Sequence, residues 1–368
     1  MPRWMYVLVV AGLVAVGARF IGAPPLLIFA LACAGLIPMA GLIGQATEEL
    51  AHHVGPKWGG LLNATFGNAA ELIILIAALR AGLFTLAKAS ITGSIIGNLL
   101  LVLGASVLAG GLKNGVQTFD GREAGRNSVM MLLATISLLL PATFQAVVDH
   151  PAVPRALLVE EVSIAVAAVL LLLYIAYIIY GLTAKEGGTA EQDVAMAAPH
   201  APAAGWRLPV AIGVLLAATA GTVLFAETLV ATVEEATHLL GWSEFFVGVI
   251  IVPLVGNVAE HVSAITFAYR NHMEIAQAIA AGSSTQVALL VGPLAVFISL
   301  LFNPLEQSLD LAFHPVEIVV VAAASLVFAY ISVDGESNWL EGLQLLGLYI
   351  IAGAVFYFLP VTGAPAAH

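Results

Sequence analysis

Two glutamates occur in the same short motif, once in each half of this 368-residue chain. Residues 67–71 and 256–260 both read Gly-Asn-x-Ala-Glu and end at Glu71 and Glu260. Each acid lies inside a long apolar stretch, where an ionised carboxylate without a partner is costly. An acid inside a membrane segment is by default a candidate functional residue. We therefore predict that Glu71 and Glu260 together bind a cation and carry protons.

The residues before each glutamate add oxygen ligands to this predicted site. Gly67 and Asn68 precede Glu71 by four and three residues, so they share its face of a helix, and Gly256 and Asn257 stand in the same way before Glu260. Glycine permits close helix approach or local unwinding, which exposes backbone carbonyls, and asparagine supplies an amide oxygen. Two carboxylates with neutral oxygen ligands suit one hard divalent cation.

The apolar stretch after each motif contains further polar residues that we predict to support the site. These residues are Ser94 and Asn98 in the first half and Ser283 and Gln286 in the second. Each pair is close to one helical turn apart, so both members can face the same point. The alternative is that they form ordinary hydrogen bonds between helices, worth about 0.6–2 kcal/mol each.

Two pairs of acids are predicted to lie at the mouths of the site. Glu48 and Glu49 are expected after the second helix, and Glu234 and Glu235 after the seventh. Such acids concentrate cations by electrostatic focusing, although solvated helix ends would carry the same residues.

Several other kinds of chemistry are not supported by the sequence. No phosphate-binding loop, dinucleotide fingerprint or nucleophile elbow is present, so we predict neither an enzyme nor a cofactor. His261 follows Glu260, but the single cysteine, Cys33, offers little for a tetrahedral zinc site. We expect no nucleic-acid partner.

The composition indicates that these residues are positioned by transmembrane helices. Hydrophobic residues make up 61% of the chain and charged residues 10%, with a mean hydropathy of +1.01, whereas soluble domains have about 25% charged residues. Stretches such as residues 164–180 are apolar on every face, which excludes the alternating pattern of a barrel strand. We predict an all-α integral membrane protein with about eleven transmembrane helices. The predicted ranges are 4–20, 25–43, 59–80, 87–110, 128–148, 157–181, 208–230, 243–268, 275–302, 314–333 and 339–360.

A sequence repeat organises these helices. An offset of 189 residues superimposes the two glutamate motifs and also places Gly282-Ser283 on Gly93-Ser94. Five helices in each copy mean that the copies enter the membrane from opposite sides, as in many secondary transporters. We therefore predict an N-terminal transmembrane helix (1–22), retained rather than cleaved, a first five-helix repeat (23–181), a hydrophilic linker (182–206) and a second, inverted repeat (207–362).

The distribution of Lys and Arg predicts the orientation. With the N-terminus in the cytoplasm, eight basic residues fall on the inside and four on the outside, which favours a cytoplasmic N-terminus and an external C-terminus. The net charge of −11 agrees with a cationic substrate.

These motifs together resemble the cation-exchanger family of Ca2+/H+ antiporters, within the calcium/cation antiporter superfamily. The segments that carry the resemblance are 61–73, 160–163, 253–261, 282–286 and 334–342. The resemblance implies two inverted five-helix repeats, whose glutamates bind Ca2+ and protons in turn, and export of Ca2+ from the cytosol by alternating access. It implies that the partners of the protein are Ca2+, H+ and a lipid bilayer. It also allows a homo-oligomer and agrees with a location in a prokaryotic plasma membrane. Members often have an acidic helix between the repeats, but this linker has only Glu186, Glu191 and Asp193.

Three other functions remain open from the sequence, and one of them, a membrane structural or receptor protein, would carry no Ca2+ at all. Sodium/calcium exchangers resemble this chain but typically have proline before the repeat acid, where Ala70 and Ala259 stand here. A passive cation channel would carry Ca2+ without regard to a proton gradient. Proton-coupled exchange of Ca2+, and of other divalent cations that fit the site, is the function that we predict.

Overall fold

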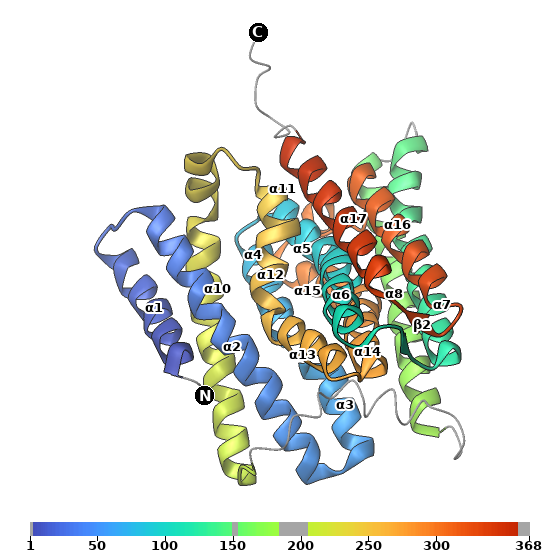
Figure 1. Cartoon of the computed structure of the whole chain (residues 1–368). Coiled ribbons are helices and arrows are strands. Elements are labelled where there is room, and N and C mark those ends of the chain that lie inside the picture. Colours follow the sequence, from blue (N-terminus) through green and yellow to red (C-terminus); the bar gives the residue numbers. More distant parts are fainter. Residues whose placement is uncertain (1–2, 149–153, 184–204, 360–368) are drawn as a thin grey trace.

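The computed structural model describes residues 3–148, 154–183 and 205–359, and this part of the chain is almost entirely helical (Figure 1). The helices of the first half are α1 (Arg3–Phe20), α2 (Pro25–Val54), α3 (Pro56–Phe66), α4 (Ala69–Arg80), α5 (Phe84–Ile96), α6 (Leu103–Asn114), α7 (Gly121–Val147) and α8 (Arg155–Thr183). Those of the second half are α10 (Leu208–Leu240), α11 (Glu244–Phe246), α12 (Val252–Gly256), α13 (Val258–Tyr269), α14 (Met273–Gln286), α15 (Gly292–Phe302), α16 (Pro315–Ile331) and α17 (Trp339–Phe358). Every range predicted to be helical contains a helix.

Short irregular turns join some of these helices into longer spans. The π-helical turns η1 (Gly97–Val102) and η3 (Val287–Val291) connect α5 to α6 and α14 to α15, and η2 (Val247–Ile251) connects α11 to α12. A 3-10 turn, η4 (Leu305–Gln307), follows α15. The strands β1 (Gln117–Thr118) and β2 (Glu336–Ser337) pair antiparallel.

The lengths of these helices establish an all-α integral membrane protein. Within the described residues, eight helices are long and apolar enough to cross a membrane, and the bent pair Glu244–Gly256 and Val258–Tyr269 makes a ninth. The apolar helix α16 is shorter, at 17 residues. The predicted third span is broken into α3 and α4 at Gly67 and Asn68.

Two helices, α2 and α10, continue at least ten residues beyond their predicted ends. The expected ends of α2 at residue 43 and of α10 at residue 230 are wrong, because α2 continues to Val54 and α10 to Leu240. The chain leaves the helical conformation only at Gly55 (φ 86°) and Gly241 (φ 67°), which adopt backbone angles that favour glycine. The acids predicted to follow these helices therefore lie inside them.

The helix boundaries repeat with the offset found in the sequence. Helices α4, α5 and α6 begin at residues 69, 84 and 103, and α13, α14 and α15 begin 189 residues later, at 258, 273 and 292. In Figure 1, α2 runs downward and α10 runs upward beside it. These two helices begin the two copies, so their opposite directions are those of an inverted repeat.

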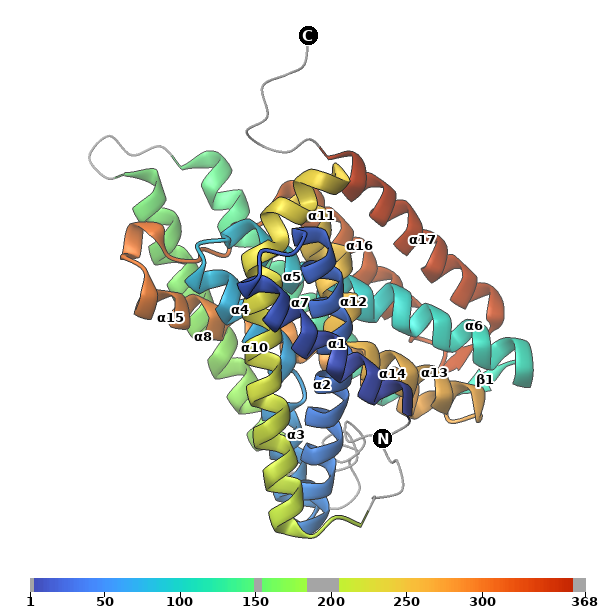
Figure 2. The same cartoon turned by 90° about the vertical axis from the view of Figure 1, so that its left-hand side faces the viewer.

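The long helices α2 and α10 and the N-terminal α1 form one side of the bundle, as both views show (Figures 1 and 2). Small residues allow this close packing, as is common between membrane helices. A Cβ atom on Gly12 of α1 would lie 2.6 Å from the ring of Phe225 on α10 and 2.9 Å from Gly35 on α2. The remaining helices form the other side, and the two broken spans α3/α4 and α12/α13 lie where the sides meet.

Candidate functional site

Both glutamate motifs coincide with a break in a membrane helix. Asn68 separates α3 from α4 with φ −101° and ψ 25°, and Asn257 separates α12 from α13 with φ −104° and ψ 12°. The second break bends the span by 63°. Glu71 and Glu260 consequently lie in the first turn of the helix that follows each break, where the helix dipole favours negative charge.

The two glutamates approach each other across the boundary between the repeats. A Cβ atom on Gly256 would lie 3.6 Å from Cγ of Glu71, so the acid of the first copy packs against the motif of the second. Glu71 is buried, whereas Glu260 is half-buried. Oε1 of Glu71 and Oε2 of Glu260 are buried and have no hydrogen-bond partner within the described residues. These two oxygens are therefore available to a cation or to a proton.

The predicted supporting residues form a hydrogen-bond network in two separate parts, each of which crosses between the repeats. Ser283 Oγ donates to Asn68 Oδ1 over 3.1 Å, and Asn257 Nδ2 donates to Ser94 Oγ over 3.5 Å. The offset of 189 residues relates these two contacts, so each asparagine reaches the serine of the other copy. Asn98 Nδ2 donates to Ser283 Oγ over 2.9 Å, and Asn68 Nδ2 donates to Gln286 Oε1 over 2.5 Å.

A cavity of about 240 Å³ leads to this network from one end of the bundle. Glu260, Asn257 and Ser283 line this cavity, and so does Glu48 on the second half of α2. Glu71 does not line it. Of the two glutamates, only Glu260 therefore borders the cavity.

Three polar residues that the sequence analysis did not single out also line this cavity: Gln45, Asn63 and Ser263. Gln45 is three residues before Glu48, Asn63 four before Gly67 and Ser263 three after Glu260. Helical spacing from the predicted residues would have found them.

The predicted mouth acids differ in position. Glu48 is 8% exposed and lines the cavity, whereas Glu49 is 2% exposed and accepts a hydrogen bond from the backbone of Trp206 over 3.1 Å. Glu234 and Glu235 are exposed at the opposite end, where Glu234 lines a separate cavity of about 630 Å³. Their role in attracting cations stays a prediction.

The described residues do not form a metal site of the kind built from three or more His, Cys, Asp or Glu side chains. In the described ranges, no three His, Cys, Asp or Glu side chains are close enough together to hold a metal ion. A cation at the break would instead be held by two carboxylates and by neutral amide, hydroxyl and carbonyl oxygens. Such oxygen ligands are those of Ca2+.

Comparison with known proteins identifies the family. The sodium/calcium exchanger protein family matches residues 24–183 and 210–358 of this chain, which include both glutamate motifs. The chain belongs to this family. The two matched segments correspond to the two halves that the sequence repeat relates.

Two relatives match this chain over nearly its whole length, and both are named as Ca2+/H+ antiporters. A Ca2+/H+ antiporter of Aphanothece halophytica is 40% identical over 346 residues, which cover 91% of each chain. The Ca2+/H+ antiporter ChaA of Bacillus subtilis is 40% identical over 361 residues, covering 98% of this chain and all of the relative.

Solved structures agree with this placement. Native YfkE has a TM-score of 0.81 and 39% identity, covering 96% of this chain and all of that structure. The H+/Ca2+ exchanger CAX shares the fold, with a TM-score of 0.68 at 19% identity over 96% of this chain and 91% of the other. The predicted fold class and family are therefore confirmed.

Proposed function

We infer that this protein is a Ca2+/H+ antiporter in which Glu71 and Glu260 bind Ca2+ and protons in turn. One observation supports this most directly: two carboxylates from opposite repeats meet at the helix breaks, each with a buried oxygen that has no partner in the described residues. The names of the relatives over nearly the full length give the same pair of ions.

Charge balance explains why exchange follows from this geometry. Two ionised carboxylates in a buried place repel each other and lack solvation, so the empty site is unfavourable. One Ca2+ or two protons remove that charge, and the two kinds of ligand compete for the same oxygens. The site can then change its exposure from one side of the membrane to the other only when it is occupied, because only an occupied site has little net charge. Ca2+ therefore moves in one direction and protons move in the other.

The neutral residues complete the coordination. Ca2+ takes six to eight oxygen ligands, roughly, more than two carboxylates supply. Asn68, Asn257, Ser94 and Ser283 present amide and hydroxyl oxygens at the helix breaks, with carbonyls freed near Gly67 and Gly256. Gln286 holds Asn68 in place by accepting a hydrogen bond from it, and Asn98 holds Ser283 in place by donating one to it.

The direction of transport depends on orientation. We propose that the N-terminus is cytoplasmic in a prokaryotic plasma membrane, so that the cavity beside Glu48 opens to the cytosol and Ca2+ is exported. We also propose the division into a helix (1–22), two repeats (23–181 and 207–362) and a linker (182–206). Most of that linker lies outside the described residues.

Proteoliposomes with an acidic lumen test the function. We expect Ca2+ to accumulate, the accumulation to collapse when an ionophore dissipates the pH gradient, and replacement of Na+ by choline to have no effect. Uptake driven by a Na+ gradient alone would support a sodium/calcium exchanger instead. Flux that ignores an opposing proton gradient would indicate a passive channel.

A further inference from the structure

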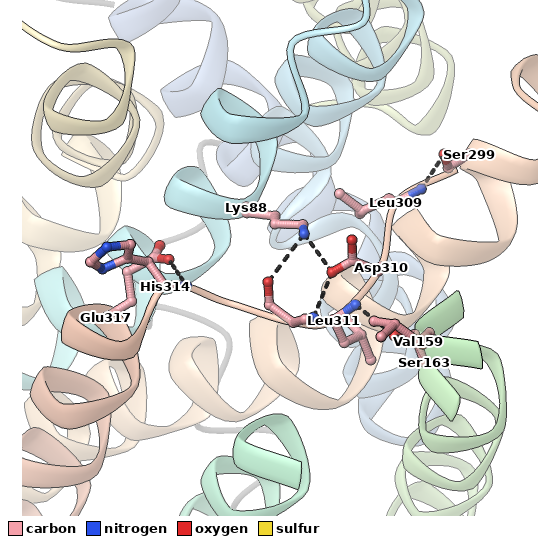
Figure 3. Close-up of polar contacts among 10 residues, drawn as sticks. Lys88, Val159, Ser163, Ser299, Leu309, Asp310, Leu311, His314 and Glu317 are labelled. Carbon is pink, nitrogen blue, oxygen red and sulfur yellow. Dashed lines mark hydrogen bonds and ion pairs between the residues drawn. The ribbon is translucent and has the colours of Figure 1, made fainter. Parts of the chain in front are cut away.

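A second polar cluster lies where the chain enters α16 (Figure 3), at the end of the bundle opposite the one where α2 terminates (Figure 1). Lys88 of α5 forms an ion pair with Asp310 and donates to the carbonyl of Ala312 over 3.1 Å. The backbone of Leu311 donates to Ser163 of α8 over 2.9 Å. The segment before α16 is therefore fixed to two helices, one of which, α5, also carries Ser94 of the ion site.

Glu317 joins α16 directly to α5. This side chain is 1% exposed, and its Oε2 accepts from the backbone of His314 over 2.8 Å within a capping box. Its Oε1 is hydrogen-bonded to Thr92 Oγ1 over 2.5 Å. Thr92 and Ser94 are two residues apart on α5, so a displacement at Thr92 is transmitted to Ser94 through a continuous helix.

The contact between Glu317 and Thr92 depends on a proton for a geometric reason. Thr92 has one hydroxyl hydrogen, but its oxygen lies within 2.5 Å of Glu317 Oε1, 3.2 Å of the Ala89 carbonyl and 3.4 Å of the Lys88 carbonyl. Against an ionised Glu317 the hydroxyl has to donate to the carboxylate. A protonated Glu317 can itself donate to Thr92, and the hydroxyl hydrogen then turns to the backbone of α5.

Glu317 lines the 630 Å³ cavity, which offers protons a route to its carboxyl group. The charged or titratable groups around it are Lys88 on α5, Asp310 and His314 on its own segment, Glu234 and His238 on α10, and Glu244 on α11. Lys88 is already paired with Asp310, so Glu234, Glu244 and Glu317 leave this cavity acidic. No residue that lines it also lines the 240 Å³ cavity.

We propose that Glu317 is a positioning residue that reports the proton concentration of the external side to the ion site, through Thr92 and α5. The proposal rests on the proposed function, because it concerns proton-driven exchange. Glu317 does not touch the carboxylates that bind the ions. It sets the position of α5, which carries Ser94 and continues into the turn η1 with Asn98, through one hydrogen-bond arrangement when ionised and another when protonated.

The other repeat supplies a matched control. Glu123 is the third residue of α7, as Glu317 is of α16, and it is also buried. The offset of 189 residues relates Thr92 to Ala281, which has no hydroxyl. Accordingly, neither carboxylate oxygen of Glu123 has a hydrogen-bond partner in the described part of the chain. Glu123→Gln removes an equivalent buried acid without removing such a contact.

The test is the dependence of Ca2+ exchange on external pH, measured in proteoliposomes of known orientation with the full chain. Glu317→Gln is expected to make the exchange rate less dependent on external pH. The KM for Ca2+ on the cytoplasmic side is expected to change less than about twofold. Thr92→Val is expected to displace the profile to higher pH by roughly one unit, because the ionised carboxylate loses a donor. Thr92→Ser restores the hydroxyl and is expected to restore the profile, and Glu123→Gln is expected to keep it.

Two results would overturn the proposal. One is a wild-type pH profile in both Glu317→Gln and Thr92→Val, and the other is an equal displacement in Glu123→Gln. If Glu317→Gln does not fold, the Thr92→Val and Thr92→Ser pair decides alone. A wild-type protein that exchanges Ca2+ without regard to pH would refute the proposed function itself, whereas a normal wild-type response with unaffected variants refutes only the role of Glu317.

Discussion

The two repeats have the same motifs but different surroundings. A Cβ atom on Gly93 would lie 2.6 Å from the Cα of Val249 in η2, whereas a Cβ atom on Gly282, its counterpart in the second repeat, would meet nothing within 4 Å. Likewise Glu71 is buried, and Glu260 lines the 240 Å³ cavity. The bundle is therefore tightly packed beside α5 and open beside α14.

We attribute this difference to conformation, because the residues concerned, Gly93-Ser94 and Gly282-Ser283, are the same in both copies. The offset of 189 residues relates Gly93 to Gly282 and Val249 to residue 60, which is in α3. If the copies exchange conformations during transport, Gly282 comes to pack against α3 while Gly93 separates from η2. Inverted repeats permit such an exchange with little change inside each copy.

The largest expected effect comes from removing either central charge. Glu71→Gln or Glu260→Gln preserves shape but leaves one titratable anion for a divalent cation, so exchange is expected to fall to background while the protein stays folded. Initial rates of Ca2+ uptake in proteoliposomes, with thermal unfolding of the purified variants, check this. Glu336→Gln, at an exposed position, is the control. Uptake near the wild-type rate in either central variant contradicts the site.

Alanine at the two equivalent glycines tests the packing difference directly. Gly93→Ala introduces a methyl group into the contact with Val249, and such overpacking typically costs about 1–3 kcal/mol. Gly282→Ala enters open space in this conformation. We expect both variants to exchange Ca2+ more slowly, since each disfavours one closed state, but only Gly93→Ala to lower the melting temperature of the purified protein. Equal losses of thermal stability would show that the difference between the copies is not conformational.

The crossed hydrogen bonds predict a smaller asymmetry. Ser283 accepts from Asn98 and donates to Asn68, whereas Ser94, within the described residues, has one side-chain hydrogen bond, of 3.5 Å, from Asn257. Hydrogen bonds between membrane helices contribute about 0.6–2 kcal/mol each. Ser283→Ala is therefore expected to raise the KM for Ca2+ roughly threefold to thirtyfold, and Ser94→Ala less. Ca2+ titration of the exchange rate measures both, and a larger effect at Ser94 would reverse the proposed order.

Much of this comparison could be predicted from the sequence, because it depends on local patterns. Hydropathy placed every helix, and the repeated motif gave the offset that relates α4 to α13. The end of α2 could not be predicted this way, since Glu48 and Glu49 look like solvated residues until neighbouring helices are seen to bury them. The end of α10 could not be predicted from hydropathy either, because its last turns carry the exposed acids Glu234 and Glu235. The contact between Glu317 and Thr92 joins residues 225 positions apart and belongs to neither motif. Nor does a repeated sequence indicate which copy is open.

The smallest expected effect concerns the mouth acids, whose burial differs between the two ends. Glu234 is exposed, and exposed charges are screened over about 8–10 Å at physiological salt. Glu234→Gln is therefore expected to change the apparent Ca2+ affinity by less than about fivefold, and the change should disappear at high salt. Glu48 is buried beside the cavity, so salt screens it less, and Glu48→Gln is expected to have a larger effect that persists at high salt. Measuring both variants at low and high ionic strength separates the two cases. If high salt removes the effects of both variants on Ca2+ affinity equally, Glu48 acts only through long-range attraction. Its position in the cavity wall then has no further consequence for Ca2+ binding.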